Sequence, residues 1–172
     1  MDKIMADEGR KFVAPFNGAV EIGLRVLAVL NDVAPVAYSL QRLVILDYLV
    51  VHSDDVPNGP IGLHPQTPHR SGELLVRRNA LQEGLLLYQS RGLIERRYEK
   101  AGVFFSATER SASFLDTLDA DYITGLRERA AWLASSFSQL SDVEIEKTVR
   151  VHLGEWGAEF VMESVLWDEE SS

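Results

Sequence analysis

Apolar residues recur at helical spacing in three segments of the first ninety residues. These segments are 18–31, 39–52 with Ser39 as N-cap, and 71–90. In each segment the apolar positions repeat every three to four residues, which is the period of an α-helix that turns one face to a core. The sequence therefore predicts three helices before residue 91.

The segment 91–109, RGLIERRYEKAGVFFSATE, has the pattern of a β-hairpin. Gly92 ends the third predicted helix, 93–99 forms a strand, Lys100-Ala101-Gly102 makes the turn, and 103–107 returns as the partner strand. Polar and apolar residues share both faces of the first strand, so the ribbon is expected to project with much of its surface in water. Three helices followed by such a hairpin are typical of a winged-helix domain, and the alternative is an ordinary surface hairpin.

The C-terminal third is predicted to be helical. A short helix near 113–118 follows the hairpin, and a longer one covers 121–137. Ser141 and Glu144 have the spacing of a capping box and open another helix. An apolar stripe ends the chain, formed by Trp156, Phe160 and Trp167.

The predicted fold class is mainly α with a small β-hairpin, built as a winged-helix-like domain plus a C-terminal helical extension. The domain covers 1–119 and includes a long prolyl loop at 52–70, and the extension covers 120–172.

A carboxylate falls inside the apolar stripe of the second predicted helix. Asp47 shares that face with leucine and valine, and an unpaired charge is costly to bury. Arg78 lies in the main apolar stripe of the third helix and is the predicted partner of Asp47 in a buried ion pair with a structural role. A backbone amide or Arg42 is the alternative partner.

The first and third predicted helices are apolar on more than one side. This additional apolar surface indicates either a subunit interface or a core thickened by the C-terminal helices. On the third helix, Arg77, Asn79 and Gln82 are scattered around the cylinder instead of forming one polar face. Because reading bases in a DNA groove needs such a face, the pattern argues against sequence-specific DNA recognition by this helix.

The net charge of −9 argues against a general polyanion binder. Basic residues concentrate at 70–100, where seven face four acidic ones, whereas 138–172 holds nine acidic and two basic residues. This acidic end is either a solvated face or a docking surface. The hairpin residues that are candidates for phosphate contact are Arg91, Arg96, Arg97 and Lys100. Glutamates are interleaved with them, so DNA contact is expected to be secondary.

Several classes of function are not supported by any motif. The chain has no cysteine, and its candidate metal ligands, in the loop, match no known ligand spacing. These candidates are His52, Asp54, Asp55, His64 and His69. We find no nucleophile elbow and no glycine-rich phosphate loop. The sequence therefore predicts no metal, no cofactor and no enzymatic activity. With no signal peptide and no apolar run long enough for a membrane, a cytoplasmic location is expected.

Several stretches together resemble one protein family. They are FNGAVEIGLRVLAVL, LQRLVILDYLVVHSDDV, LHPQTPHRSGELLVRRNALQEGLLLYQSRGLIE, LRERAAWLASSF and GEWGAEF. The chain is similar in these stretches to the small middle component of ABC-three-component systems, a family that overlaps the middle subunit of Lamassu-type bacterial defence systems. The motif LHPQTPHRSGELLVRR is the most specific part.

The resemblance implies a non-catalytic adaptor that stands between an SMC- or Rad50-like ABC ATPase and an effector, often a nuclease, in immunity against phages and plasmids. It supplies no catalytic residues. The residues expected at protein interfaces are His64, Pro65, His69, Arg70, Arg77, Trp156, Phe160 and Trp167. The alternative is a free-standing winged-helix transcriptional regulator that binds DNA.

Overall fold

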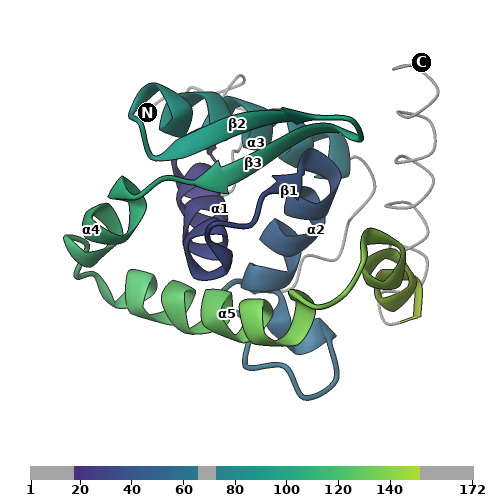
Figure 1. The fold of residues 1–172 in the computed structure, drawn as a ribbon. Coiled ribbons are helices and arrows are strands. Elements are labelled where there is room, and N and C mark those ends of the chain that lie inside the picture. The colour runs from purple at the N-terminus through teal and green to yellow at the C-terminus, as the bar shows by residue number, and fades with distance from the viewer. Residues whose placement is uncertain (1–17, 66–72, 152–172) are drawn as a thin grey trace, which may run out of the picture.

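The computed structural model describes residues 18–65 and 73–151 (Figure 1). The elements, in chain order, are α1 (Ala19–Val33), β1 (Tyr38–Ser39), α2 (Leu40–Val51), a single 3₁₀ turn (Ser53–Asp55), α3 (Glu73–Ser90), β2 (Ile94–Glu99), β3 (Gly102–Ala107), α4 (Arg110–Asp116) and α5 (Asp121–Phe137). Residues 142–151 are also helical. The fold is therefore mainly helical with one small antiparallel sheet, as the sequence predicted in outline.

Local signals in the sequence set several of these boundaries. The Ser39 hydroxyl accepts a hydrogen bond from the Arg42 amide at 3.2 Å and caps α2. Ser141 and Glu144 form the predicted capping box, in which each side chain accepts from the other residue's backbone amide, at 2.7 and 3.2 Å. Gly92 takes a left-handed φ of 72° directly after α3, which confirms that it ends that helix.

The hairpin belongs to a three-stranded sheet in the order β1-β3-β2. Tyr38 pairs with Phe105 and Ser39 with Phe104, so the short link between α1 and α2 is tied to β3. The sequence prediction contained only the hairpin and missed β1. A two-residue strand is too short to show the alternation of polar and apolar residues that identifies longer strands.

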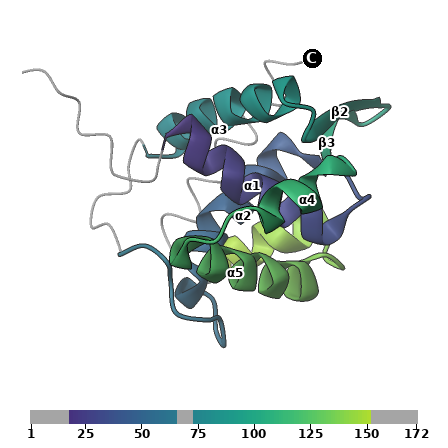
Figure 2. The same ribbon diagram turned by 90° about the vertical axis from the view of Figure 1, so that its left-hand side faces the viewer.

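The helices enclose one core. Figure 2 shows α1 between α3 above and α5 below, with α4 in front. Buried residues of α5, namely Leu126, Ala130, Leu133 and Phe137, join the same hydrophobic cluster as those of α1, α2 and α3. The first predicted helix is apolar on more than one side, and a subunit interface or a core extended by C-terminal helices could explain this. The packing of α5 against α1 supports the second explanation for most of these residues.

α1 and α3 cross at two glycines. A Cβ atom on Gly84 would lie 2.7 Å from the carbonyl oxygen of Ala19 and 3.0 Å from the Cα of Gly23. Such distances are below those of ordinary packing, so only glycine permits this approach. The crossing also brings the Tyr88 hydroxyl to 2.9 Å from the Val20 carbonyl oxygen, to which it donates a hydrogen bond.

Candidate functional site

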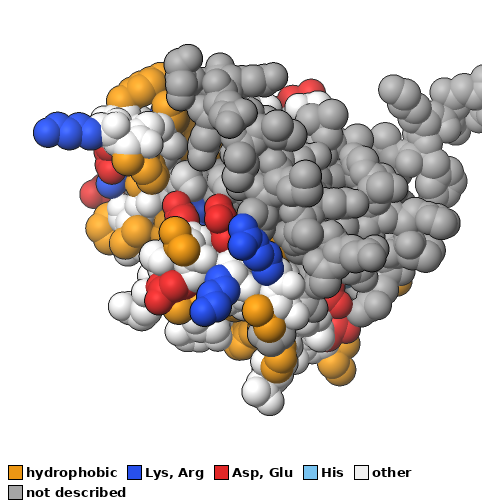
Figure 3. Space-filling view, turned by 90° about the vertical axis from the view of Figure 1, so that its right-hand side faces the viewer, with side chains coloured by type: hydrophobic (Ala, Val, Ile, Leu, Met, Phe, Trp, Pro, Cys, Tyr) orange, Lys and Arg blue, Asp and Glu red, His pale blue; other side chains and the backbone are white. Residues whose placement is uncertain are grey.

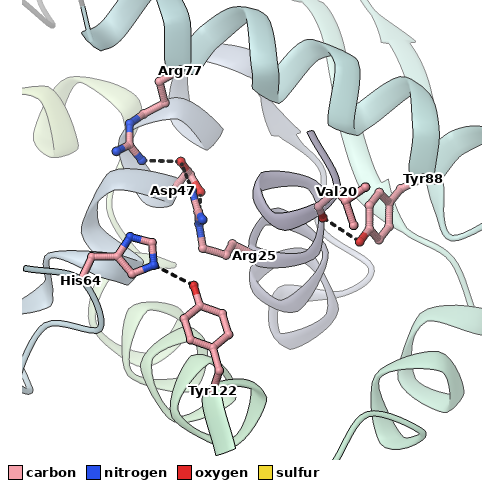
Figure 4. A network of polar contacts seen from close by, with 7 residues as sticks. All are labelled: Val20, Arg25, Asp47, His64, Arg77, Tyr88 and Tyr122. Atoms are coloured by element: carbon pink, nitrogen blue, oxygen red, sulfur yellow. Dashed lines mark hydrogen bonds and ion pairs between the residues drawn. The ribbon is translucent and has the colours of Figure 1, made fainter. Parts of the chain in front are cut away.

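A cluster of three charged side chains lies at the centre of the core. Asp47 of α2 accepts from Nε of Arg25 at 2.7 Å on one carboxylate oxygen, and from Nη1 of Arg77 at 2.6 Å on the other (Figure 4). Nη2 of Arg25 also donates to the second oxygen at 3.2 Å. Because the three residues come from α1, α2 and α3, the cluster joins the three helices at one point.

The cluster keeps its charges although it is shut off from water. Burial alone would raise the pKa of Asp47, but the charges and hydrogen bonds of Arg25 and Arg77 outweigh it and leave this pKa below its ordinary value. Burial would likewise lower the pKa of Arg25, yet Asp47 and, to a lesser extent, Tyr122 hold it above its ordinary value. Both oxygens of Asp47 are occupied by guanidinium donors, so the carboxylate is suited to structural pairing.

The prediction of a buried Asp47 ion pair is right about the carboxylate and wrong about its partner on the third helix. Arg77, not Arg78, reaches Asp47. Arg77 lies four residues before the buried Leu81 and eight before Leu85, so it lies on the inward side of α3. Arg77 was also expected at a protein interface, whereas only 7% of it is exposed and its guanidinium turns inward.

Sequence reasoning missed Arg25, which is the most completely buried cation of the cluster. It was not among the residues that the sequence predicted to be buried, yet its exposed fraction is 0%. A signal was available: Arg25 follows Ile22 by three residues and precedes Val29 by four, and both are buried. That spacing places all three on one helix face.

The first part of the prolyl loop is fastened to α2 and α5. The His64 amide donates to the Val51 carbonyl at 3.1 Å, and Nε2 of its ring lies 2.9 Å from the Tyr122 hydroxyl (Figure 4). Arg129 of α5 donates from Nε and Nη2 to the Ile61 carbonyl, at 2.8 and 2.6 Å. The loop up to residue 65 is thus held by side chains distant in sequence.

His64 is partly buried and lies beside the charge cluster (Figure 4). Burial, and then electrostatic interactions with Arg25 and His52, lower the pKa of His64 to about 4. The ring is therefore neutral near pH 7, and in the tautomer that carries its hydrogen on Nδ1, Nε2 accepts a hydrogen bond from the Tyr122 hydroxyl. This places a predicted interface residue in an internal contact, while its neighbour Pro65 is exposed.

The described residues offer no group of three or more histidine, aspartate or glutamate side chains arranged to hold a metal ion. Within this part of the chain, His52 and His64 do approach each other, with ring centroids 6.3 Å apart in an edge-on arrangement. Among residues 18–65 and 73–151, no helix is long and apolar enough to cross a membrane. Five predicted interface residues lie outside the described residues: His69, Arg70, Trp156, Phe160 and Trp167.

The basic residues of the hairpin do not form one row. The pairing of Arg96 with Phe105 and of Arg97 with Phe104 puts the two arginines on opposite faces of the sheet. Arg96 lies over the ring of Phe105 at 5.6 Å, whereas Arg97 shares its face with Glu95 and Glu99. The other two candidates for phosphate contact, Arg91 and Lys100, are exposed. On the side of the molecule in Figure 3, the described Lys and Arg side chains lie among Asp and Glu side chains.

The solvent side of α3 is poor in cations. Its exposed side chains between Arg77 and Gln89 are Asn79, Gln82, Glu83 and Leu86, while Arg78 is half-buried. The set includes one acid and one leucine that is 56% exposed, and no lysine or arginine. Phosphate binding and base reading both rely on basic and amide groups side by side, so this part of α3 fits a protein surface better than a DNA groove.

The chain matches the model of a known protein family over most of its length. A family model described as ABC-three component (ABC-3C) system Middle Component 2 matches residues 15–159, which include both described ranges up to residue 151. No curated protein and no solved structure matches the chain.

Proposed function

Because the chain belongs to the Middle Component 2 family of ABC-three component systems, we propose that it is a non-catalytic adaptor subunit of a bacterial defence complex against phages and plasmids. In this proposal it links an SMC- or Rad50-like ABC ATPase to an effector such as a nuclease. The observation that carries the proposal is the family match over residues 15–159, since a middle component implies other components to bind.

The adaptor is built on a winged-helix scaffold in this proposal. Support comes from the order α1, β1, α2, α3, β2, β3 and from the sheet order β1-β3-β2, in which the hairpin β2–β3 would be the wing. The charge pattern supports a protein-binding use of that scaffold. The described solvent side of α3 lacks cations, and the wing arginines Arg96 and Arg97 point to opposite faces.

The experiment that tests the adaptor role is co-expression of the chain with the ATPase and the effector encoded beside it. Affinity capture through a tag on this chain should retain both proteins at fixed stoichiometry, and omission of the chain should separate the ATPase from the effector. If the two associate equally well without it, the adaptor role is wrong.

The competing function is a DNA-binding regulator, and a second measurement separates the two. The isolated chain is titrated with labelled duplex DNA at several salt concentrations. An adaptor should show at most weak, strongly salt-dependent binding, with a Kd in the range of about 1–100 µM that is typical of non-specific contact. Sequence-selective binding at about 10 nM or tighter, without any partner, would favour the regulator.

A further inference from the structure

An open groove with an apolar floor lies where α1, α3 and α4 meet, away from the charge cluster. Its volume is about 980 Å³. The apolar lining consists of Val20, Leu87, Tyr88, Leu93 and Phe114. In Figure 2 this side faces the viewer, with α4 in front of α1 and below α3.

The floor of the groove is held in shape without any ligand. The Tyr88 hydroxyl donates to the Val20 carbonyl, and the rings of Tyr88 and Phe114 meet edge to face with centroids 6.3 Å apart. Burial, and then Glu21, raise the pKa of Tyr88 to about 12, so the hydroxyl stays a neutral donor. A preformed apolar floor lowers the ordering cost of binding.

The rim carries two guanidinium groups that have no ionic partner among the described residues. Arg91 follows α3 and Arg110 begins α4, and both are exposed. A Cβ on Gly92 would lie 2.9 Å from Nη1 of Arg110, so this guanidinium lies against the Gly92 backbone beside the groove. Glu109 also lines the rim, which leaves an excess of one positive charge there in a chain whose net charge is −9.

The shape argues against a small-molecule pocket. Six of the ten lining residues are exposed: Val20, Arg91, Glu109, Arg110, Ser113 and Thr117. A pocket for a small ligand encloses most of the ligand's surface, whereas a site with most of its lining exposed can receive a chain segment. Val20 is 56% exposed at its edge, which leaves apolar area for such a segment to cover.

We propose that this groove is the docking site for an amphipathic helix of a partner subunit, with its apolar side on Leu87, Leu93 and Phe114 and with acidic residues beside Arg91 and Arg110. The inference rests on the adaptor role and names the surface through which it acts. Charge complementarity selects the occupant, because unpaired guanidinium groups beside an apolar floor favour carboxylates flanking an apolar stripe.

The first test measures binding of the purified full-length chain to the ATPase and to the effector. Arg91→Glu combined with Arg110→Glu should weaken binding to one of them by about tenfold or more, the usual effect of opposing like charges at an interface. The matched control is Lys147→Glu with Arg150→Glu, which makes the same change in charge on the exposed surface of 142–151. The control should change the Kd by less than about threefold, which sets its effect apart from a tenfold loss.

The second test identifies the occupant. A photo-crosslinking amino acid replaces the exposed Thr117 at the groove, in the chain co-expressed with both companion subunits. The expected crosslink is to a partner segment with apolar residues at helical spacing and flanking Asp or Glu. Replacing those acids with lysine should restore binding to the Arg91→Glu, Arg110→Glu variant.

Several results would overturn the inference while leaving the adaptor role intact. These are wild-type affinity of the double variant, an equal loss in the control, or a crosslink only to a second copy of this chain or to its own residues. If the wild-type chain binds neither companion subunit, the adaptor role itself fails. Circular dichroism melting curves of all variants establish that each is folded.

Discussion

The Arg25 guanidinium lies 2.7 Å from the Asp47 carboxylate in the middle of a largely apolar core. Neither side chain is exposed to water, and Arg77 closes the remaining side of the carboxylate at 2.6 Å. The cost of burying three charges is offset only while all three remain together. The cluster therefore fixes the relative positions of α1, α2 and α3, on which the surface of the protein is built.

Removal of Asp47 should destabilise the fold strongly. In Asp47→Asn, two buried guanidinium groups lose their counter-charge, and the free energy of unfolding should fall by about 3 kcal/mol or more. Arg25→Met should cost a similar amount, because it leaves the carboxylate with one partner. Urea unfolding followed by circular dichroism measures both.

The matched control for these variants is the exposed pair of Arg127 and Asp116, 2.7 Å apart. Arg127→Met should cost less than about 1 kcal/mol, since water screens a surface ion pair. Equal losses for Arg25→Met and Arg127→Met would contradict the view that the buried cluster holds the helices.

Only part of this charge cluster could be predicted from the sequence. Asp47 could be identified because a carboxylate interrupts an apolar stripe. Spacing alone did not decide between Arg77 and Arg78, because Arg77 lies four and eight residues before Leu81 and Leu85 and Arg78 lies three and seven before them, and all four separations fit one helix face. The burial of Arg25 could have been predicted from its spacing to Ile22 and Val29. However, the first helix is apolar on several sides, so its pattern does not show which side faces the centre of the core.

The groove between α1, α3 and α4 could not be predicted from the sequence, because separate segments form its walls. Its walls come from the start of α1, the end of α3 and α4, and nothing local in any of these segments indicates that they meet. The helices and the hairpin could be predicted because each rests on a periodic pattern or a cap within its own segment. Features made by several segments together depend on packing.

Stability should depend on pH through His64. The pKa of His64 is about 4 in the folded protein, below the ordinary value of 6.5, so the unfolded chain binds the proton more tightly. Stability should therefore be lost as pH falls from about 6.5 to about 4, by roughly 1 kcal/mol after allowance for the partial exposure of the ring. Urea unfolding at a series of pH values measures this.

His64→Gln is the matched variant, because glutamine can still accept from Tyr122 but does not titrate. Its stability should change less than that of the wild type over this interval. The pKa of Asp47 is lowered from an ordinary 3.8, so loss of stability through Asp47 begins only at lower pH. If variant and wild type lose stability in parallel between pH 6.5 and 4, another group is responsible.

The hairpin arginines offer a test of DNA contact that is separate from assembly. Arg96 and Arg97 lie on opposite faces of the sheet, so one DNA backbone cannot readily meet both. We expect Arg96→Glu with Arg97→Glu to leave assembly with the companion subunits intact. If the variant loses two phosphate contacts, the slope of log K for duplex binding against log salt concentration should change by about two. We expect a smaller change in this slope. A change in slope of about two would instead indicate that the hairpin β2–β3 contacts DNA.

The crossing of α1 and α3 should not tolerate even one methyl group. In Gly84→Ala, the new Cβ would meet backbone atoms of Ala19 and Gly23, which cannot rotate away, so the helices must separate at a cost of about 2–3 kcal/mol. Gly125→Ala in α5 is the control. Its Cβ would lie 3.0 Å from a terminal methyl of Leu63 and 3.2 Å from Nη1 of Arg129, both of them ends of side chains that can shift, while alanine favours the helix by about 1 kcal/mol. Thermal melting should therefore show a marked loss for Gly84→Ala and little change for Gly125→Ala. Similar melting temperatures for both variants would mean that the crossing is looser than these distances indicate.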